Sequence, residues 1–392
     1  MSLAAQLAPH YTRFRVSERL LLTGHSHQAW PDVAVEGQLE AYADAAELVD
    51  EKWGRAFARA DLVRDGFRHL LGDPAAELAL GANTRELVVR FLSALDLRAR
   101  PRLVTTDGEF HSARRQLARL REAGVSVVVV PASPVDTLSD RLAAAVDVRT
   151  AAVLTSSVLF ETARVVTGLG DLASACTRVG AELLVDVYHQ LGVVPLALEE
   201  AGLGSAWVVG GGYKYLQLGE GNCFLRLPPQ AASLRPVITG WYAEFGALAA
   251  ESGSDRVAYG PGATRFAGST YDPTSHYRAA RVLEFFSSQG LTVDVLAASY
   301  RRQRGLLAAA FDDLDAPDAV ITRDRATDPT GFGGFLSLTS PHASQLQALL
   351  AERGVLTDSR GQHLRFGPAP YLSDVQLEEA VGHLGEVLRD LD

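Results

Sequence analysis

The feature that most constrains the fold is a regular alternation of short β-branched segments with amphipathic helical segments through the middle of the chain. We expect strands at 103–105, 125–130, 151–154 and 182–187, and helices at 111–122 and 169–179. Strands that alternate with helices form βαβ units, in which the strands are parallel and the helices cover the sheet. The sequence therefore predicts an α/β fold with a mostly parallel sheet.

The two ends of the chain have a different pattern. The first 75 residues are predicted to be mostly helical, with one helix opening at Pro31-Asp32 and another at Asp61. After about Leu291, long helices at 291–314, 342–353 and 373–391 alternate with short predicted strands, as in an α+β lobe. We expect three parts: an N-terminal segment (1–60) that packs with the small domain, a large domain (61–285) and a smaller α+β C-terminal domain (286–392).

The bulk composition narrows the class of protein. Of the 392 residues, 47% are hydrophobic and 21% are charged, and the formal net charge is −10. No long run of lysine and arginine is present, so nucleic acid is not expected as a partner. The apolar stretches are too short to span a membrane, and no secretory signal peptide is expected. With two cysteines, Cys176 and Cys223, a cytoplasmic protein is expected.

Lysine is nearly absent from this chain, and one of its two lysines stands in an unusual place. Lys214 lies in Gly-Tyr-Lys-Tyr at 212–215, directly after a predicted strand at 206–209. Burial lowers the pKa of a lysine and so makes its neutral amine available as a nucleophile toward an aldehyde. A surface-turn lysine is the alternative, but the scarcity of lysine favours a catalytic role for Lys214.

Polar residues also follow the predicted strand at 182–187. Asp186 ends its hydrophobic run, and His189 follows three residues later in Asp-Val-Tyr-His. The carboxyl ends of parallel strands are where α/β sheets bind ligands. A carboxylate there can pair with a protonated pyridine nitrogen and keep the ring an electron sink, although an aspartate that caps a helix is the alternative.

Two further segments have the residue types of a phosphate and ring site. Asn83 and Thr84 precede a predicted helical run at 87–95, where they would offer a hydroxyl and free backbone N–H groups to a phosphate, or simply cap the helix. Phe110 follows the predicted strand at 103–105 and would stack on a pyridine ring, unless it is a core residue.

Together, and in this order, these residues resemble the fold-type I pyridoxal 5′-phosphate enzymes, and within them the class V aminotransferase group. The resemblance implies a three-layer large domain with a mostly parallel sheet and a smaller α+β C-terminal domain. It also implies pyridoxal 5′-phosphate as the cofactor, held as a Schiff base on Lys214. The other cofactor-binding residues that it implies are Asn83, Thr84, Phe110, Asp186, His189 and Tyr213.

Within this group the sequence is most similar to the kynureninases. These carry Tyr-Lys-Tyr-Leu, matched at 213–216, and Gly-Trp before an aromatic residue, matched at 240–242. Near the C-terminus they carry Arg-Phe-Gly followed by a proline and a tyrosine, matched at 365–367, Pro370 and Tyr371. In that family the arginine holds the substrate carboxylate, so Arg365 is expected to do so here, and a bidentate guanidinium group suits the task.

The resemblance to kynureninases implies hydrolytic cleavage of the Cβ–Cγ bond of kynurenine or a relative to an aromatic acid and alanine, as in tryptophan catabolism. Lys214 would release the aldehyde to the amino acid and then move protons, while Asp186 would hold the pyridine N–H. Tyr213 would hydrogen-bond the phosphate or assist proton transfer.

The resemblance also implies assembly. Enzymes of this group build each active site from two subunits, so we expect a homodimer with shared sites. Ser269 and Thr270 would reach the phosphate of the neighbouring subunit, and Trp241 would also lie at the cofactor.

The chain departs from the kynureninase pattern in two segments. The family's Gly-Asn-Ser-Leu-Gly is replaced by Gly-His-Ser-His-Gln at 24–28, and a Gly-Thr-Pro-Pro-like stretch is replaced by Gly-Ser-Thr-Tyr-Asp-Pro at 268–273. Both would lie where the substrate side chain is sensed. His25 and His27 are therefore predicted to contact the substrate, and the pocket would also suit a relative of kynurenine.

Several alternatives remain at this point. An aminotransferase, or a lyase acting on another amino acid, fits the same cofactor residues. A cysteine desulfurase needs a mobile cysteine in the C-terminal third, where this chain has none. A non-catalytic binding protein predicts loss of Lys214 or Asp186, and an oxidoreductase predicts a G-x-G-x-x-G after the first strand, which is missing. The histidines are too widely separated to predict a metal site.

Overall fold

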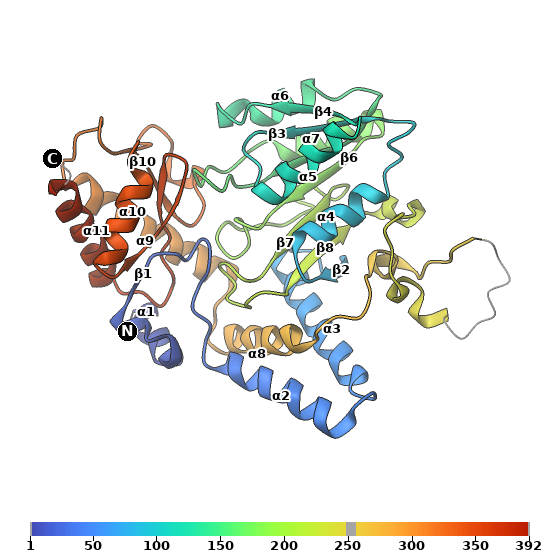
Figure 1. Cartoon of the computed structure of the whole chain (residues 1–392), viewed down its shortest axis with the longest axis horizontal. Coiled ribbons are helices and arrows are strands. Elements are labelled where there is room, and N and C mark those ends of the chain that lie inside the picture. The colour runs from blue at the N-terminus through green and yellow to red at the C-terminus, as the bar shows by residue number, and fades with distance from the viewer. Residues whose placement is uncertain (1, 248–255, 391–392) are drawn as a thin grey trace.

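The structure is a computed structural model that describes residues 2–247 and 256–390 (Figure 1). Within these residues, seven strands form the central sheet in the order β2-β8-β7-β6-β5-β3-β4. Their bounds are β2 Glu77–Gly81, β3 Arg102–Thr106, β4 Ser126–Val130, β5 Thr150–Ser156, β6 Glu182–Asp186, β7 Trp207–Gly211 and β8 Cys223–Leu227. Strands β3, β4, β5, β6 and β7 are parallel to one another, and β8 is antiparallel to both β2 and β7. The prediction of a mostly parallel sheet is confirmed.

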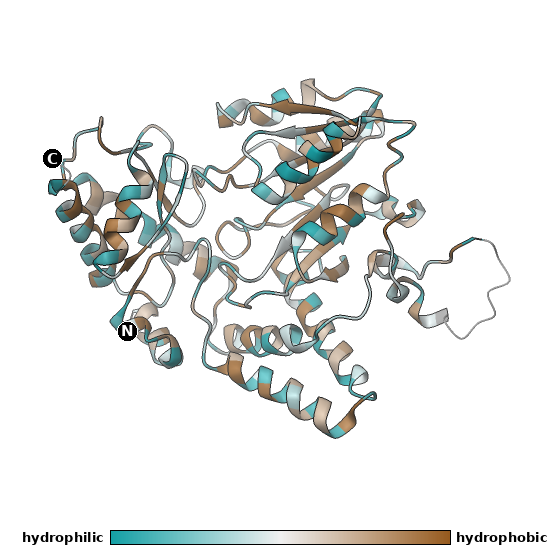
Figure 2. Cartoon of the chain, in the orientation of Figure 1, coloured by the Kyte–Doolittle hydropathy of each residue, from teal (hydrophilic) through white to brown (hydrophobic). Residues whose placement is uncertain are grey.

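The central strands are mostly apolar and are buried because helices cover both faces of a parallel sheet. Every residue of β5, β7 and β8 is buried, and Figure 2 shows strongly hydrophobic strands beneath helices with hydrophilic outer faces. The covering helices include α4 Thr84–Ser93, α5 His111–Glu122, α6 Leu138–Ala144 and α7 Leu169–Val179. In α7, Leu169, Leu172, Ala173 and Cys176 are buried, which is the i, i+3, i+4, i+7 spacing of an amphipathic helix.

The C-terminal part forms a smaller lobe, as predicted. Its antiparallel sheet has the order β12-β13-β10-β9. The strand bounds are β9 Thr322–Arg323, β10 Leu336–Thr339, β12 Asp358–Arg360 and β13 His363–Phe366, and the helices are α9 Val293–Asp312, α10 Ala343–Glu352 and α11 Asp374–Arg389. A capping box between Ser373 and Gln376 begins α11. The predicted end of this helix at Leu391 lies outside the described residues.

The N-terminal segment contacts two different parts of the molecule. After α1 (Leu3–Leu7) and three short 3₁₀ turns (Ala8–His10, Thr12–Phe14 and Val16–Glu18), β1 (Leu20–Leu21) pairs in parallel with β11 (Val355–Leu356) of the small lobe. Figure 1 shows this blue segment beside the red C-terminal helices. The next two helices, α2 (Val33–Leu48) and α3 (Trp53–Leu70), instead pack on α8 (Thr274–Ser288).

One predicted helix start is wrong. Asp61 does not open a helix, because α3 begins at Trp53 and runs through Asp61 to Leu70. The aspartate pairs with Arg64 one turn later, at 2.6 Å on the exposed side of the helix. An acidic residue in an i, i+3 ion pair and an acidic N-cap look alike in a single sequence.

The loop after β1 is locked to the end of β13. The Gly24 N–H donates to the Gly367 carbonyl at 2.8 Å, and the Gly367 N–H donates to the Leu22 carbonyl at 2.7 Å. A Cβ on Gly24 would lie 2.2 Å from the Pro368 carbonyl oxygen, so only glycine permits this approach. The loop at 23–28 is thereby held over the carboxyl ends of β6 and β7, where the candidate site lies. None of the described helices is both long and apolar enough to cross a membrane.

Candidate active site

Lys214 is buried just beyond the end of β7, with only 6% of its surface exposed. Its Nζ lies 2.7 Å from His189 Nε2. Three aromatic rings surround it, with centroids 4.7 Å (Tyr188), 5.5 Å (Phe110) and 5.8 Å (Tyr213) from Nζ. The sequence-based prediction of a buried lysine at a strand end therefore agrees with the structure.

These surroundings change the chemistry of the Lys214 amine. Burial lowers the pKa of Lys214 to about 7, and the positive charge of Arg365 acts in the same direction, while Asp186 opposes it. A large share of the amine is therefore neutral near pH 7. A neutral amine is the nucleophilic form that condenses with an aldehyde.

Asp186 ends β6 and is partly buried close to this lysine. Its Oδ1 accepts a hydrogen bond from the Tyr188 N–H at 2.8 Å. Burial raises the pKa of Asp186, whereas that hydrogen bond and the charge of Lys214 lower it. Among the described residues no ion-pair partner lies within hydrogen-bond distance of this carboxylate. A partly desolvated carboxylate without such a partner is costly, so the site is suited to a ligand that brings a positive N–H.

His189 is the second polar neighbour of Lys214. Burial lowers the pKa of His189 well below its usual range, and the positive charges of Lys214 and Arg365 add to this effect. The ring is therefore neutral, and its Nδ1 is buried without a hydrogen-bond partner among the described residues. An unpaired buried nitrogen of this kind is characteristic of a ligand site.

A buried carboxyl group supports the same sheet edge, and sequence reasoning missed it. Glu109 accepts hydrogen bonds from Thr106 Oγ1 at 2.7 Å and from the hydroxyl and N–H of Ser156 at 2.6 and 3.1 Å. Ser156 is the register partner of Asp186 in the neighbouring strand. Burial raises the pKa of Glu109 to about 7. Glu109 thus ties the ends of β3 and β5 together beside Asp186.

The predicted phosphate turn stands at the N-terminus of α4. Asn83 is the N-cap, and its Oδ1 accepts a hydrogen bond from the Glu86 N–H at 3.0 Å. The Thr84 N–H is directed at the Cys223 thiol of β8. A helix N-terminus next to a buried lysine offers backbone N–H groups and a favourable dipole to an anion.

Phe110 precedes α5 and is half-buried. Its ring packs edge-on against Phe160 at 5.4 Å and lies on the Lys214 side of this helix. Tyr213 is sandwiched between two other rings, Tyr188 at 4.9 Å and His27 at 5.0 Å. Burial raises the pKa of Tyr213 to about 12, so its hydroxyl keeps its proton and remains a hydrogen-bond donor.

Arg365 enters the same region from β13. It is 3% exposed, and its Nη1 donates to the Phe160 carbonyl at 2.5 Å while its Nη2 donates to Asp358 Oδ2 at 2.5 Å. The guanidinium face lies over Phe335, with 5.7 Å to the ring centroid. Asp358 was not predicted from the sequence, because an aspartate on a short strand carries no distinctive motif.

The two predicted histidines of the N-terminal loop lie at different depths. His25 is fully buried, packs in a tilted arrangement against the Phe335 ring at 4.6 Å and has no hydrogen-bond partner for either ring nitrogen among the described residues. His27 is exposed and covers Tyr213, and its Nε2 lies 3.6 Å from Glu220 Oε1. Both therefore belong to the Lys214 region, His25 at its base and His27 at its edge.

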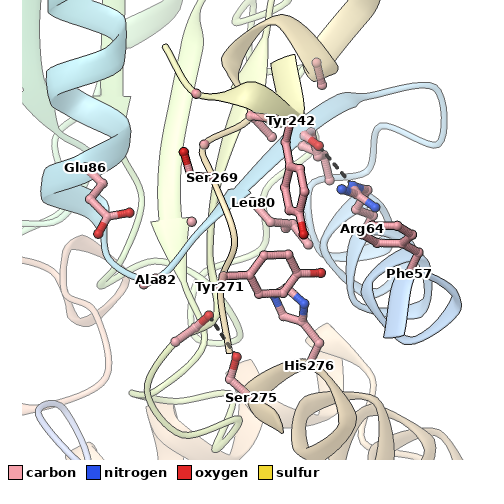
Figure 3. Close-up of a pocket in the computed structure, with 18 of the residues that line it drawn as sticks. Phe57, Arg64, Leu80, Ala82, Glu86, Tyr242, Ser269, Tyr271, Ser275 and His276 are labelled. Carbon is pink, nitrogen blue, oxygen red and sulfur yellow. Dashed lines mark hydrogen bonds between the residues drawn. The ribbon is translucent and has the colours of Figure 1, made fainter. Parts of the chain in front are cut away.

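Trp241, Ser269 and Thr270 are not brought to Lys214 within one chain. Trp241 is 44% exposed, and its Nε1 donates to Thr270 Oγ1 at 3.3 Å. Ser269 and Thr270 line a separate cavity of about 1120 Å³ (Figure 3), which includes Ala82 but none of the residues around Lys214. In Figure 3, Ser269 lies on the side of Ala82 and Glu86, across the cavity from Phe57.

Comparisons with known proteins agree with this geometry. No family model matches the chain. It is 24% identical over 365 residues to the uncharacterized aminotransferase YcbU of Bacillus subtilis, which covers 89% of this chain and 90% of that protein. It is 26% identical over 372 residues to a kynureninase of Deinococcus radiodurans, which covers 89% of this chain and 87% of the relative.

Among solved structures, the fold is similar to that of a lysine-to-alanine mutant of C-DES with glycine covalently linked to its pyridoxal-phosphate cofactor. The TM-score is 0.82 at 16% identity, over 96% of this chain and 98% of that one. The fold is therefore that of the fold-type I pyridoxal-phosphate enzymes, and the lysine-centred site suits their cofactor. Among enzymes of this fold the chain is similar to the class V aminotransferase group, with distant similarity to kynureninases and to YcbU.

The residues present fit this cofactor. The buried lysine with a lowered pKa suits the aldehyde, Asp186 suits a protonated ring nitrogen, and the N-terminus of α4 suits a phosphate. His189, whose Nδ1 is unpaired, and the ring of Phe110 both lie next to the Lys214 amine. Among the described residues no cluster of potential metal ligands is found.

Proposed function

We propose that this enzyme is of the kynureninase type and hydrolyses the Cβ–Cγ bond of kynurenine or a close relative to an aromatic acid and alanine. The observation that carries the proposal is the wall of aromatic rings next to the amine and the arginine. Phe110, Tyr188 and Tyr213 surround Lys214, and His27 extends the stack outward. An aromatic amino ketone would stack on these faces.

Arg365 would hold the α-carboxylate of the amino acid. Its guanidinium is buried, and it lies near enough to Lys214 to lower the pKa of that amine. A planar fork of donors binds a carboxylate with two parallel hydrogen bonds, which also orients the carbon that must react.

The remaining residues would hold the cofactor and transfer protons. Pyridoxal phosphate, when bound, supplies the electron sink. Asp186 would keep the ring nitrogen protonated. Asn83 and Thr84 would present the N-terminus of α4 to the phosphate. Tyr213 would donate a hydrogen bond from its hydroxyl to the phosphate, or would take part in proton transfer. Lys214 would exchange protons at the substrate carbons.

We also infer a two-fold homodimer. Trp241, Ser269 and Thr270 lie away from Lys214 of their own chain and near the surface. In a dimer they would reach the cofactor of the partner. Sedimentation with activity measured across protein concentration tests this inference, because a fully active monomer would contradict it.

The substrate test is direct. The cofactor-loaded enzyme is incubated with L-kynurenine and with L-3-hydroxykynurenine, and the products are separated by chromatography. We expect an anthranilate and alanine in equal amounts. Transamination or cleavage of another amino acid, with neither kynurenine cleaved, would reject the kynureninase proposal and leave the cofactor class unchanged.

The second candidate is an aminotransferase or lyase acting on another amino acid, which the similarity to YcbU favours. A desulfurase-like role for either cysteine is poorly supported. Cys176 and Cys223 are both buried, and burial raises the pKa of each thiol to about 12. Neither would supply a thiolate near pH 7.

A further inference from the structure

The carboxylate position on Arg365 is already occupied by a residue of the protein. Asp358 and Arg365 are register partners in the β12–β13 pair, and Asp358 Oδ2 lies 2.5 Å from Arg365 Nη2. The other oxygen, Oδ1, accepts a hydrogen bond from Arg360 Nη1 at 2.7 Å. Because the Asp358 side chain is largely buried, an arriving carboxylate would meet an anion at the donor it needs.

A second position for the Asp358 carboxylate lies close by. His25 Nε2 is 3.8 Å from Asp358 Oδ2, which is too far for a hydrogen bond but within reach of a small side-chain rotation. Neither ring nitrogen of His25 has a partner among the described residues, although the ring is fully buried. A buried unpaired nitrogen would be stabilised by the arrival of a carboxylate.

The histidine itself is held in place. Its ring packs against Phe335 in a tilted arrangement, and a Cβ on Gly367 would lie 2.2 Å from its Nδ1, so the backbone leaves no room on that side. The interlocked backbones of Gly24 and Gly367 fix the loop. Any change in the distance between Asp358 and His25 must therefore come from movement of the Asp358 side chain.

We propose that Asp358 is a displaceable anion that marks the arrival of the substrate carboxylate. Before the amino acid binds, Asp358 neutralises Arg365. The α-carboxylate then takes its place on Arg365, and Asp358 rotates onto His25 to form a buried Asp–His pair. This inference rests on the assignment of Arg365 to the α-carboxylate in the proposed function.

The movement of Asp358 changes the protonation of His25. The charged and titratable groups that face His25 are Arg365 and Arg360 of the small lobe, Lys214 and His189 of the large sheet, His27 of its own loop and Asp358. Burial and the positive groups hold the pKa of His25 well below its usual range. With Asp358 beside it and a carboxylate on Arg365, the pKa rises and the ring takes one proton from solvent. That proton is placed next to the bound amino acid and returns to solvent when Asp358 moves back.

Propionate is a suitable probe, because it has the carboxylate of an amino acid but neither an amine nor a side chain. Its binding to the cofactor-loaded enzyme is measured by titration calorimetry near pH 7 in two buffers of different ionisation enthalpy, which yields both Kd and the protons taken up. The variants are Asp358→Asn, His25→Gln and Arg365→Lys. Asp374→Asn, which removes an aspartate from an exposed arginine pair, is the matched control.

The expected results distinguish the roles of Asp358, His25 and Arg365. The wild-type enzyme and Asp374→Asn take up a fraction of a proton approaching one, and Arg365→Lys binds propionate more weakly. Asp358→Asn binds propionate about tenfold more tightly, because no internal carboxylate competes, and takes up no proton. His25→Gln binds propionate but takes up no proton. Asp358→Ser serves in place of Asp358→Asn if that variant does not fold.

Three outcomes would overturn the inference. Wild-type binding without proton uptake excludes the His25 step. Weaker binding by Asp358→Asn means that Asp358 only orients Arg365. Proton uptake that persists in Asp358→Asn means that the bound anion acts on His25 directly. Failure of the proposed function is seen separately, as no anthranilate from L-kynurenine, and does not alter the propionate result.

Discussion

The candidate site has two halves that are built in different ways. The Lys214 half comes from the ends of neighbouring strands in one sheet, where Asp186, His189 and Lys214 follow β6 and β7. The Arg365 half comes from distant segments, with His25 from the N-terminal loop and Asp358 and Arg365 from the small lobe. The spacing of the first half is set by strand register, whereas that of the second depends on how the loop and the lobe pack.

The two halves also differ in their electrostatics. In the Lys214 half, burial pushes the lysine toward its neutral form and raises the pKa values of Asp186 and Glu109. In the Arg365 half, the buried guanidinium stays charged and is neutralised by an internal aspartate. One half is thus prepared for covalent and proton chemistry, and the other for recognition of an anion.

The largest effect is expected at Lys214. Lys214→Ala should abolish turnover and the visible absorbance of the bound cofactor, because no other amine lies in the site. Lys52→Ala, which changes the chain's other lysine, is the matched control and should retain both. Reductive trapping followed by peptide mass spectrometry should locate the cofactor on Lys214. Visible absorbance that persists in Lys214→Ala would contradict the assignment.

The next largest effect is expected at Asp186, which also belongs to the Lys214 half. Asp186→Ala should still bind the cofactor through Lys214 and the α4 N-terminus, yet lose about 10²–10⁴-fold in kcat/KM. Removing one partner of a buried charge pair costs about 3–5 kcal/mol, and each 1.36 kcal/mol is tenfold in rate. The measurement is steady-state kinetics on variants whose cofactor content is matched by absorbance. Nearly normal turnover would make Asp186 a purely structural residue.

A smaller loss is expected in the Arg365 half. Arg365→Lys should lose about 1.5–3 kcal/mol of substrate binding, because an ammonium ion cannot reproduce two parallel hydrogen bonds. That corresponds to roughly 10- to 150-fold in KM. Arg302→Lys is the control, since Arg302 forms a bidentate pair with Asp374 on the exposed surface. Equal effects of the two changes would argue against a carboxylate site at Arg365.

The smallest effect is a pH dependence of the rate of cofactor attachment, which involves the Lys214 half alone. The neutral form of Lys214 attacks the aldehyde, so in cofactor-free protein the rate of cofactor attachment should rise about tenfold per pH unit below pH 7 and level off above it. A lysine with its ordinary pKa would show the rise continuing to about pH 10. Stopped-flow absorbance across pH 5.5–9 distinguishes the two. Arg365→Lys should leave the shape of this profile nearly unchanged.

Sequence reasoning succeeded where contacts are local or set by strand order. The alternation of strands and helices predicted the parallel sheet, and Asp186 and Lys214 were expected at neighbouring strand ends because parallel strands align their carboxyl ends. It failed at Asp61, where an exposed ion pair resembles a helix cap, and it passed over Glu109 and Tyr188 although both lie inside segments that were singled out.

By itself, the sequence determined the fold class, because hydrophobic periodicity follows from short stretches of chain. Its resemblance to the class V aminotransferase group gave the cofactor class, and the residue types at the strand ends led to the prediction that Lys214 holds the cofactor. Only the tertiary structure decided that His25 is buried and unpaired while His27 is exposed. It also decided that Asp358 forms an ion pair with the guanidinium of Arg365. These contacts join residues hundreds of positions apart or on separate strands, and their distances depend on the packing of the lobe and the loop, which no local pattern encodes.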